Sequence, residues 1–165
     1  MSDSGTQPRR DLAAMVKERF GEHVKDTASA PKGDFCVTVD RERIIDVARF
    51  VKSDLELDML MDETCVDYPE RSPRFELIYN FYSVISHERL FVKVHADDDE
   101  SGVPSLTVVF RCADWFEREI YDMFGVRFAG HPNLRRILMY EGFSGHPLRK
   151  DYDARERQPL IGPKD

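Results

Sequence analysis

The sequence predicts an α+β protein: a two-layer domain with a mixed sheet covered by helices, followed by an extended C-terminal arm. Apolar residues recur first at helical spacing and then in alternation, and both patterns end well before the C-terminus. Four of the nine prolines fall in the last 34 residues, and each favours an extended conformation in the residue before it. We therefore expect a disordered N-terminus at residues 1–8, the α+β domain at residues 9–126 and a basic arm at residues 127–165.

Helical spacing marks two segments early in the chain and one later segment. Residues 11–20 place apolar side chains at i, i+4 and i+8, and a glycine follows as a stop signal. Residues 41–54 follow Asp40, a good N-cap, and carry a core-facing stripe at i, i+3, i+4 and i+7. A third helical region is expected over residues 104–125, with a break near residues 112–114.

Alternation of apolar and polar residues predicts the strands. Residues 34–39 are rich in Phe, Val and Thr, and residues 74–83 and 89–95 alternate between two faces. The segment VISHER between the last two indicates a hairpin turn, so we expect these strands to be antiparallel neighbours. Residues 59–66 form a further predicted strand. The acidic run at residues 97–102 lacks the spaced ligands of a calcium loop and is interpreted as a solvated turn.

The distribution of charge argues against general nucleic-acid binding. The net charge of the chain is −7. Residues 1–126 carry 16 basic and 26 acidic side chains, whereas residues 127–165 carry 8 and 5. Nucleic-acid binding needs a basic face, so an acidic body argues against it as a general activity, and the arm is the exception as a basic segment.

Cysteine usage and the N-terminus predict a cytoplasmic chain without a metal cluster of its own. Cys36, Cys65 and Cys112 are widely spaced and lie among apolar neighbours, so we interpret all three as buried free thiols. No window reaches the roughly 18 apolar residues of a membrane span, and the first residues lack the apolar run of a secretory signal.

The segment DWFEREIYDMFGVRF, residues 114–128, holds the densest set of candidate residues. As a helix it presents a core face formed by Phe116, Ile120, Met123 and Phe124. A second face carries Trp115, Glu119 and Asp122. Paired carboxylates beside an aromatic ring can serve acid–base catalysis when burial separates their pKa values. The structural alternative, which we favour because no nucleophile accompanies them, is an Arg118–Asp122 pair with a glutamate that anchors a neighbouring strand or arm.

The stretch GHPNLRRILMYEGFSGHPLRKDY, residues 130–152, repeats a Gly-His-Pro unit followed by cations. His131 and His146 are too far apart and too extended to suggest a zinc site. A phosphate clamp is open as an alternative, although no glycine-rich loop supplies backbone donors. We favour docking, because an extended arm with this many apolar residues gains order only against a protein surface. Arginine is also suited to bidentate contact with carboxylates at interfaces.

These residues carry a family resemblance. WFEREIYDMFGVRFAGHPNLRRILMYEGFSGHPLRKDY, residues 115–152, resembles the signature of the C subunit of respiratory NADH–quinone oxidoreductase (complex I), the 30 kDa subunit family. Its pattern E-R-E-x-x-D-x-x-G corresponds to Glu117, Arg118, Glu119, Asp122 and Gly125, and G-H-P-L-R-K-D-Y to residues 145–152. Upstream, VDYPERSPRFELIYNFYS resembles the Asp-Tyr-Pro segment and the strand after it. Asp153 departs from the proline that often follows in the family.

The resemblance implies a non-catalytic peripheral-arm subunit, without flavin, iron–sulfur cluster or quinone of its own, on the cytoplasmic side of the bacterial inner membrane. The implied partners are the D subunit with the quinone site, the B subunit with the terminal iron–sulfur cluster, and the I subunit. The absence of a fused D subunit indicates the unfused form. Three alternatives remain: the equivalent subunit of an energy-converting hydrogenase-type complex, a stand-alone acid–base enzyme, and a nucleic-acid module that uses the arm, against which the acidic body counts.

The predicted partner-interface residues belong to the third helical segment and the arm. They are Glu117, Arg118, Glu119, Asp122, Gly125, His131, Arg135, Arg136, Gly145, His146, Arg149, Lys150 and Asp151.

Overall fold

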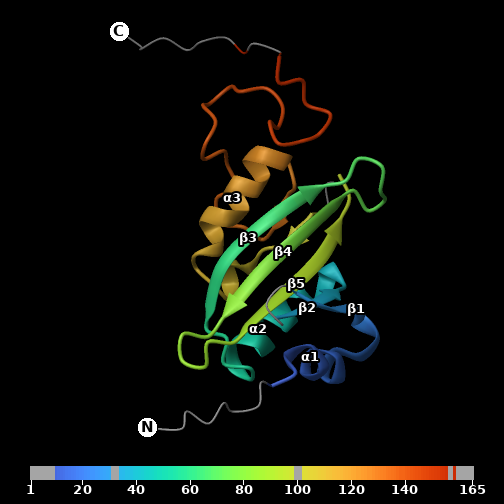
Figure 1. Cartoon of the computed structure of the whole chain (residues 1–165). Helices are drawn as coiled ribbons and strands as arrows, with labels where there is room; N and C mark the ends of the chain where they lie inside the picture. Colours follow the sequence, from blue (N-terminus) through green and yellow to red (C-terminus); the bar gives the residue numbers. More distant parts are fainter. Residues whose placement is uncertain (1–9, 31–33, 99–101, 156–157, 159–165) are drawn as a thin grey trace, which may run out of the picture.

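The computed structural model describes residues 10–30, 34–98, 102–155 and 158. Its centre is a five-stranded sheet in the order β1-β2-β5-β4-β3 (Figure 1). The β2–β5 pair is parallel and the other three pairs are antiparallel, so the sheet is mixed. The prediction of an α+β fold with a mixed sheet and helices is confirmed. The segment predicted to be disordered, residues 1–8, lies outside the described residues.

Four of the five strands form where they were predicted and one was not predicted. The strands are β1 (Val24–Ser29), β2 (Phe35–Val39), β3 (Met59–Asp67), β4 (Phe75–Tyr82) and β5 (Arg89–Ala96). No local pattern marks β1, because it is an edge strand with only its first residue buried and so needs no apolar alternation. The β4–β5 hairpin is antiparallel, as predicted.

The core lies on one face of the sheet. Every second residue of β4, from Phe75 to Phe81, is fully buried, and β5 alternates in the same way. The opposite face of β5 carries the partly exposed Phe91 and Lys93. Buried apolar residues of all three helices, among them Val16, Val47 and Ile120, join the same apolar cluster as the inner face, so the domain has two layers.

The first two helices form where the apolar stripes predicted them. In α1 (Leu12–Phe20) the Asp11 carboxylate accepts the N–H of Ala14 at 2.9 Å, and Gly21 ends the helix. In α2 (Ile44–Ser53) all four stripe residues are buried. The predicted N-cap of α2 is wrong: a 3₁₀ turn precedes the helix, and the Asp40 carboxylate contacts His23 Nδ1 at 2.9 Å instead.

The third helical region is shorter than predicted. Only α3 (Ala113–Phe124) is an α-helix, whereas β6 (Val103–Pro104) and a 3₁₀ turn occupy the start of the expected span. β6 pairs in parallel with β7 (Phe128–Ala129). The backbone N–H groups of Val103 and Ser105 donate to the chain around β7, and Glu117 binds the N–H of Leu106. Pairing with β7 holds the start of the segment extended, with Ser105 at φ −66° and ψ 135°, so these residues do not form the first turn of a helix.

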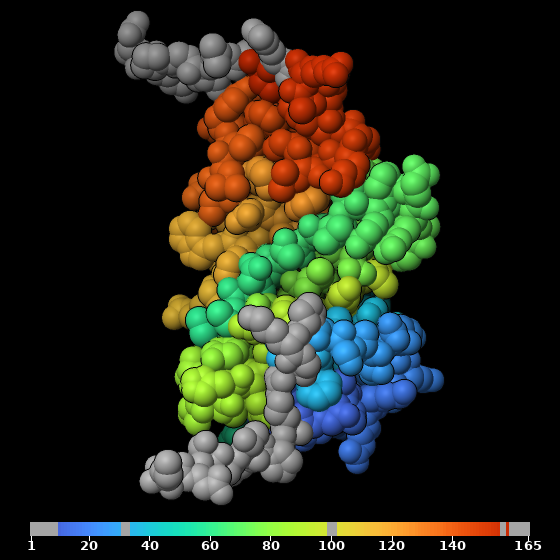
Figure 2. Space-filling view, in the orientation of Figure 1, coloured from blue at the N-terminus to red at the C-terminus, as the bar shows by residue number. Residues whose placement is uncertain are grey.

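Residues 130–155 contain no helix or strand and proceed through a series of turns. They run along α3 from its N-terminal end, where His131 lies, and then cover the end of the molecule beyond the C-terminal end of this helix, far from α1 (Figure 1 and Figure 2).

The interpretation of all three cysteines as buried free thiols is partly wrong. Cys36 and Cys65 are buried free thiols, and burial raises the pKa of each. Cys112 is exposed because it precedes α3 at a turn, although its Sγ lies 3.6 Å from the Leu60 carbonyl oxygen.

Candidate functional site

The C-terminal end of α3 is one of the points where the arm is fastened to the domain. α3 ends at Gly125, which adopts a left-handed conformation with φ 78° and donates its N–H to the Tyr121 carbonyl. A Cβ atom on Gly125 would lie 2.6 Å from both His146 Nε2 and Arg149 Nη2. Glycine is thus required twice here, for the positive φ and for the close approach of the arm.

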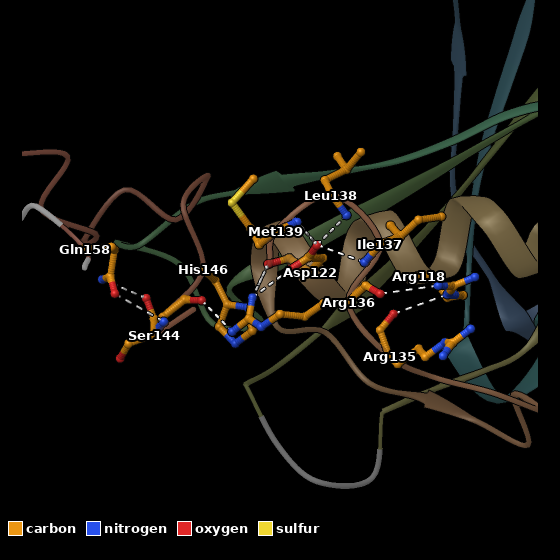
Figure 3. Close-up of polar contacts among 11 residues, drawn as sticks. Arg118, Asp122, Arg135, Arg136, Ile137, Leu138, Met139, Ser144, His146 and Gln158 are labelled. Carbon is orange, nitrogen blue, oxygen red and sulfur yellow. Dashed lines mark hydrogen bonds and ion pairs between the residues drawn. The ribbon is translucent and has the colours of Figure 1, made fainter. Parts of the chain in front are cut away.

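Asp122 binds the arm with its side chain. Its carboxylate is fully buried and accepts the consecutive N–H groups of Ile137, Leu138 and Met139 at 3.0, 2.8 and 2.8 Å (Figure 3). It also pairs with Arg136 Nη1 at 2.6 Å. Burial acts to raise the pKa of Asp122, but these hydrogen bonds outweigh it and lower the pKa below the ordinary value. The group is an anion that orders three residues of the arm.

The second Gly-His-Pro unit caps the helix. The last carbonyls of an α-helix lack intrahelical donors. Here His146 Nδ1 donates to the Asp122 carbonyl at 3.0 Å, the Leu148 N–H to the Met123 carbonyl at 3.0 Å, and Arg149 Nε to the Phe124 carbonyl at 2.5 Å. Burial lowers the pKa of His146, so the imidazole is neutral at pH 7. We call the contacts of Asp122, Arg136, His146 and Arg149 the arm clasp.

The first Gly-His-Pro unit contacts the other end of α3. The His131 side chain is fully buried, and its Nδ1 accepts the N–H of Asn133 at 3.0 Å. Its Nε2 must then carry the proton, and it lies 3.2 Å from both the carbonyl oxygen and the Oδ1 of Asp114. The two histidines therefore fix the two ends of one helix, each as a hydrogen-bond donor.

Two arginines link the helix to the chain between the two units. Arg136 joins Asp122 to the Gly145 carbonyl, which its Nη2 reaches at 2.8 Å. Arg118 donates to the carbonyls of Arg135 and Arg136 at 3.2 and 3.3 Å (Figure 3). The expected Arg118–Asp122 ion pair is wrong, because Arg136 from the arm takes that position beside the carboxylate.

The end of the arm is tied to the sheet and to the acidic loop. Arg149 forms two bonds with Asp98, at 2.6 and 2.8 Å. The predicted solvated turn agrees with the exposure of Asp97 and Asp98, although Asp98 also pairs with Arg149, and residues 99–101 lie outside the described residues. The N–H of Lys150 donates to Asp67, and Asp151 pairs with Arg74, at 2.8 and 2.9 Å. Arg74 also forms an ion pair with Asp67. The bonds that Arg74 and the Lys150 N–H make to the Asp67 carboxylate lower the pKa of Asp67.

Glu117 is an internal residue of the domain. It is fully buried, and its carboxylate accepts the Leu106 N–H at 2.6 Å and the Ser105 hydroxyl at 2.7 Å. Burial raises the pKa of Glu117 to about 7. Glu63 on β3 is also buried, and burial followed by the charge of Glu117 raises its pKa well above the ordinary value. The anchoring glutamate that the sequence suggested is Glu117 rather than Glu119.

Five residues that contribute to the site around α3 and the arm were not predicted from the sequence. They are Glu63, Asp67, Arg74, Asp98 and Ser105. The two acids on β3 had a usable signal, since both share the alternating face of the buried Cys65. The other three carry no local signal, because a pattern of neighbouring residues does not show which distant side chain will meet them.

Five of the predicted interface residues remain on the surface. They are Glu119, Arg135, Gly145, Lys150 and Asp151. The acid–base pair considered from the sequence is not assembled, since Glu119 faces solvent and Asp122 is a buried anion of lowered pKa. Among the described residues, no group of three or more His, Cys, Asp or Glu side chains could hold a metal ion. No helix in this part of the chain is long and apolar enough to cross a membrane.

The fold and the clasp define a class: a mixed-sheet α+β protein whose C-terminal segment is fixed to its last helix by buried charged residues. The family described as "Respiratory-chain NADH dehydrogenase, 30 Kd subunit" matches residues 37–158. The chain belongs to this family, that of the C subunit of NADH-quinone oxidoreductase, and is thus one subunit of a multi-subunit oxidoreductase.

Two curated relatives are C subunits of NADH-quinone oxidoreductase. The C subunit of NADH-quinone oxidoreductase from Geobacter sulfurreducens is 42% identical over 150 residues, which cover 89% of this chain and 92% of the relative. The C subunit from a Chelativorans species is 45% identical over 155 residues, 93% of this chain and 74% of the relative.

Two solved structures share the fold. The trypsin-resistant fragment (1-134) of Nqo5 superposes with a TM-score of 0.65 at 27% identity, covering 74% of this chain and 98% of the fragment. A chain of the membrane-bound sulfane sulfur reductase, an archaeal respiratory membrane complex, gives a TM-score of 0.71 at 23% identity, covering 86% of this chain and 83% of that chain. The second likeness concerns the fold alone.

Proposed function

We propose that the chain is a non-catalytic scaffold within NADH-quinone oxidoreductase, holding the quinone-site region together while electrons pass from NADH to quinone. Its partners are the D subunit, the B subunit and the I subunit, on the cytoplasmic side of the inner membrane. In this proposal the flavin, the iron–sulfur clusters and the quinone are carried by partner subunits. The arm, residues 127–165, is the docking element.

The arm clasp is the observation that carries this proposal. Asp122, Arg136, His146 and Arg149 all serve to hold residues 136–149 in one conformation against α3. An arm ordered in advance loses less conformational entropy when it binds a partner than a free tail does. It presents Arg135, Leu138 and Leu148 to the outside, where they form a mixed charged and apolar surface.

Affinity purification of the tagged full chain from native membranes in mild detergent tests the proposal. The expected result is co-purification of the quinone-site, iron–sulfur and NADH-binding subunits in fixed proportion. Recovery of the chain alone, as a stable monomer, contradicts it.

The second candidate is the equivalent subunit of a hydrogenase-type or other energy-converting membrane complex. The fold shared with the sulfane sulfur reductase chain favours it to the extent that a fold can. The same purification separates the two, because that complex lacks the flavin- and NADH-binding subunits.

A further inference from the structure

A groove of about 500 Å³ lies between α3 and the arm. Arg118 and Tyr121 line it from the helix, and Arg135, Arg136 and Glu141 line it from the arm, together with apolar side chains. Three of these residues are arginines and one is acidic. Neither Glu141 nor any other carboxylate among the described residues pairs with Arg118 or Arg135.

Arg118 is a buried cation without an anionic partner in the described part of the chain. It is 8% exposed, and its two hydrogen bonds go to backbone carbonyls. Its guanidinium carbon lies 5.4 Å from the ring of Trp115. A desolvated charge is costly unless an opposite charge compensates it. The groove therefore has room and electrostatic reason for an anion beside Arg118.

Arg135 adds a second free charge at the same groove. Its side chain is exposed and makes no hydrogen bond or ion pair within the described residues. Arg136, the third arginine, is neutralised by Asp122. The groove thus carries two uncompensated guanidinium groups, one buried and one exposed.

The surroundings favour a protein ligand over a free phosphate. The N–H groups of residues 137–139, which could otherwise cradle a phosphate, already bind Asp122. Trp115 is 61% exposed beside Arg118, and Tyr121 lines the groove. Trp, Tyr and Arg together are the residues enriched where protein interfaces are strongest.

We propose that this groove binds an acidic segment of a partner subunit, with a carboxylate side chain paired with Arg118 and Arg135 and an apolar neighbour against Trp115. Guanidinium groups bind carboxylates bidentately, which gives both energy and orientation. The proposal rests on the chain being a docked subunit, and it specifies where the contact lies and what chemistry the partner brings.

Zero-length cross-linking in the intact complex tests it. Arginine does not couple to carboxylates with a water-soluble carbodiimide, but the amine introduced by Arg135→Lys does: the carboxylate oxygen is activated, the amine displaces it, and an amide forms as the carbodiimide leaves as a urea. Arg49→Lys is the matched control, since Arg49 is exposed on α2 and lines a different groove near α1. The expected result is a new cross-link from position 135 to an Asp or Glu of another subunit, absent with Arg49→Lys.

Charge reversal at Arg135 gives a second test of the groove proposal. Arg135→Glu should make the chain dissociate from the complex at lower salt than wild type, whereas Arg49→Glu should leave the dissociation point unchanged. The groove proposal is overturned if Arg135→Lys cross-links only to Glu141 of its own chain, or if it gives no cross-link and Arg135→Glu dissociates at the same salt concentration as wild type. The scaffold function still stands in these cases as long as the wild-type chain co-purifies with the complex. Loss of co-purification of the wild-type chain overturns both. Binding of phosphatidylglycerol vesicles that Arg135→Glu abolishes, without a cross-link, assigns the groove to lipid and also overturns the proposal.

Discussion

Replacing Asp122 with alanine should release the arm while leaving the domain folded. The substitution removes the acceptor of three backbone N–H groups and the partner of Arg136. Removing one member of a buried ion pair costs about 3–5 kcal/mol, because it leaves the other charge uncompensated. Each hydrogen bond to a charged group contributes roughly 1.5–3 kcal/mol, but these terms do not add, since an open arm rehydrates its donors.

The size of this free-energy loss determines which measurement can detect it. About 3–5 kcal/mol raises the open population of the arm by roughly a hundred- to several-thousand-fold. The sheet and its core do not depend on Asp122, so the loss falls on the arm rather than on the whole chain. Trypsin cleavage at the arginines of the arm should accelerate accordingly, because proteolysis follows the open population when reclosing is fast. Circular dichroism should report an unchanged sheet.

Asp46→Ala is the matched control. Asp46 forms one exposed ion pair with Arg43 at 3.3 Å, and pairs of that kind contribute about 0–1 kcal/mol. Its variant should be cleaved at the wild-type rate. Wild-type cleavage of Asp122→Ala as well would refute the argument that this carboxylate holds the arm.

The pH dependence of the same contact has a definite sign. The pKa of Asp122 is lower in the folded chain than its ordinary value of 3.8. Its stabilisation is therefore present above pH 3.8 and lost as the pH falls through the folded pKa. The rate of arm cleavage, measured with an acid-active protease below about pH 4 and with trypsin above about pH 6, should rise only at the acid end.

Three further predictions concern the surroundings of the clasp. Gly125→Ala should also release the arm, because the new Cβ would meet His146 and Arg149. Gly130→Ala should not release it, because Gly130 has a similar φ of 81° but nothing lies within 4 Å of its added Cβ. The rates of trypsin cleavage compare the two variants. Arg149→Glu should lower the fraction of chain found in the complex but not the turnover of complexes that contain it; normal assembly with reduced turnover contradicts the docking role. Glu63→Gln should raise the thermal midpoint by on the order of 3 °C at about pH 8 and not at about pH 5. The pKa of Glu63 is raised in the folded chain, so the wild-type chain loses stability as the pH rises. Equal thermal midpoints of wild type and Glu63→Gln at about pH 8 would contradict this reasoning.

The sequence predicted the elements whose pattern is local. β3, β4 and β5 were found within a residue or two because alternation is read from neighbouring positions, and one face of each strand lies against the core. The same local rule failed at β1, an exposed edge strand, and at the start of the region before α3, where pairing with β7 holds the chain extended. The clasp residues were identified as a group, but their partners within the chain were not.

The sequence by itself determined the mixed α+β fold and marked the residues around both Gly-His-Pro units as important. Only the tertiary structure decided what each of them does. Asp122 stands on the polar face of α3, and its burial comes from arm residues that lie 14 to 17 positions later in the chain. The physical reason is that burial and hydrogen-bond partners depend on what packs over a surface, whereas periodicity depends only on the turn of the helix or the pleat of the strand.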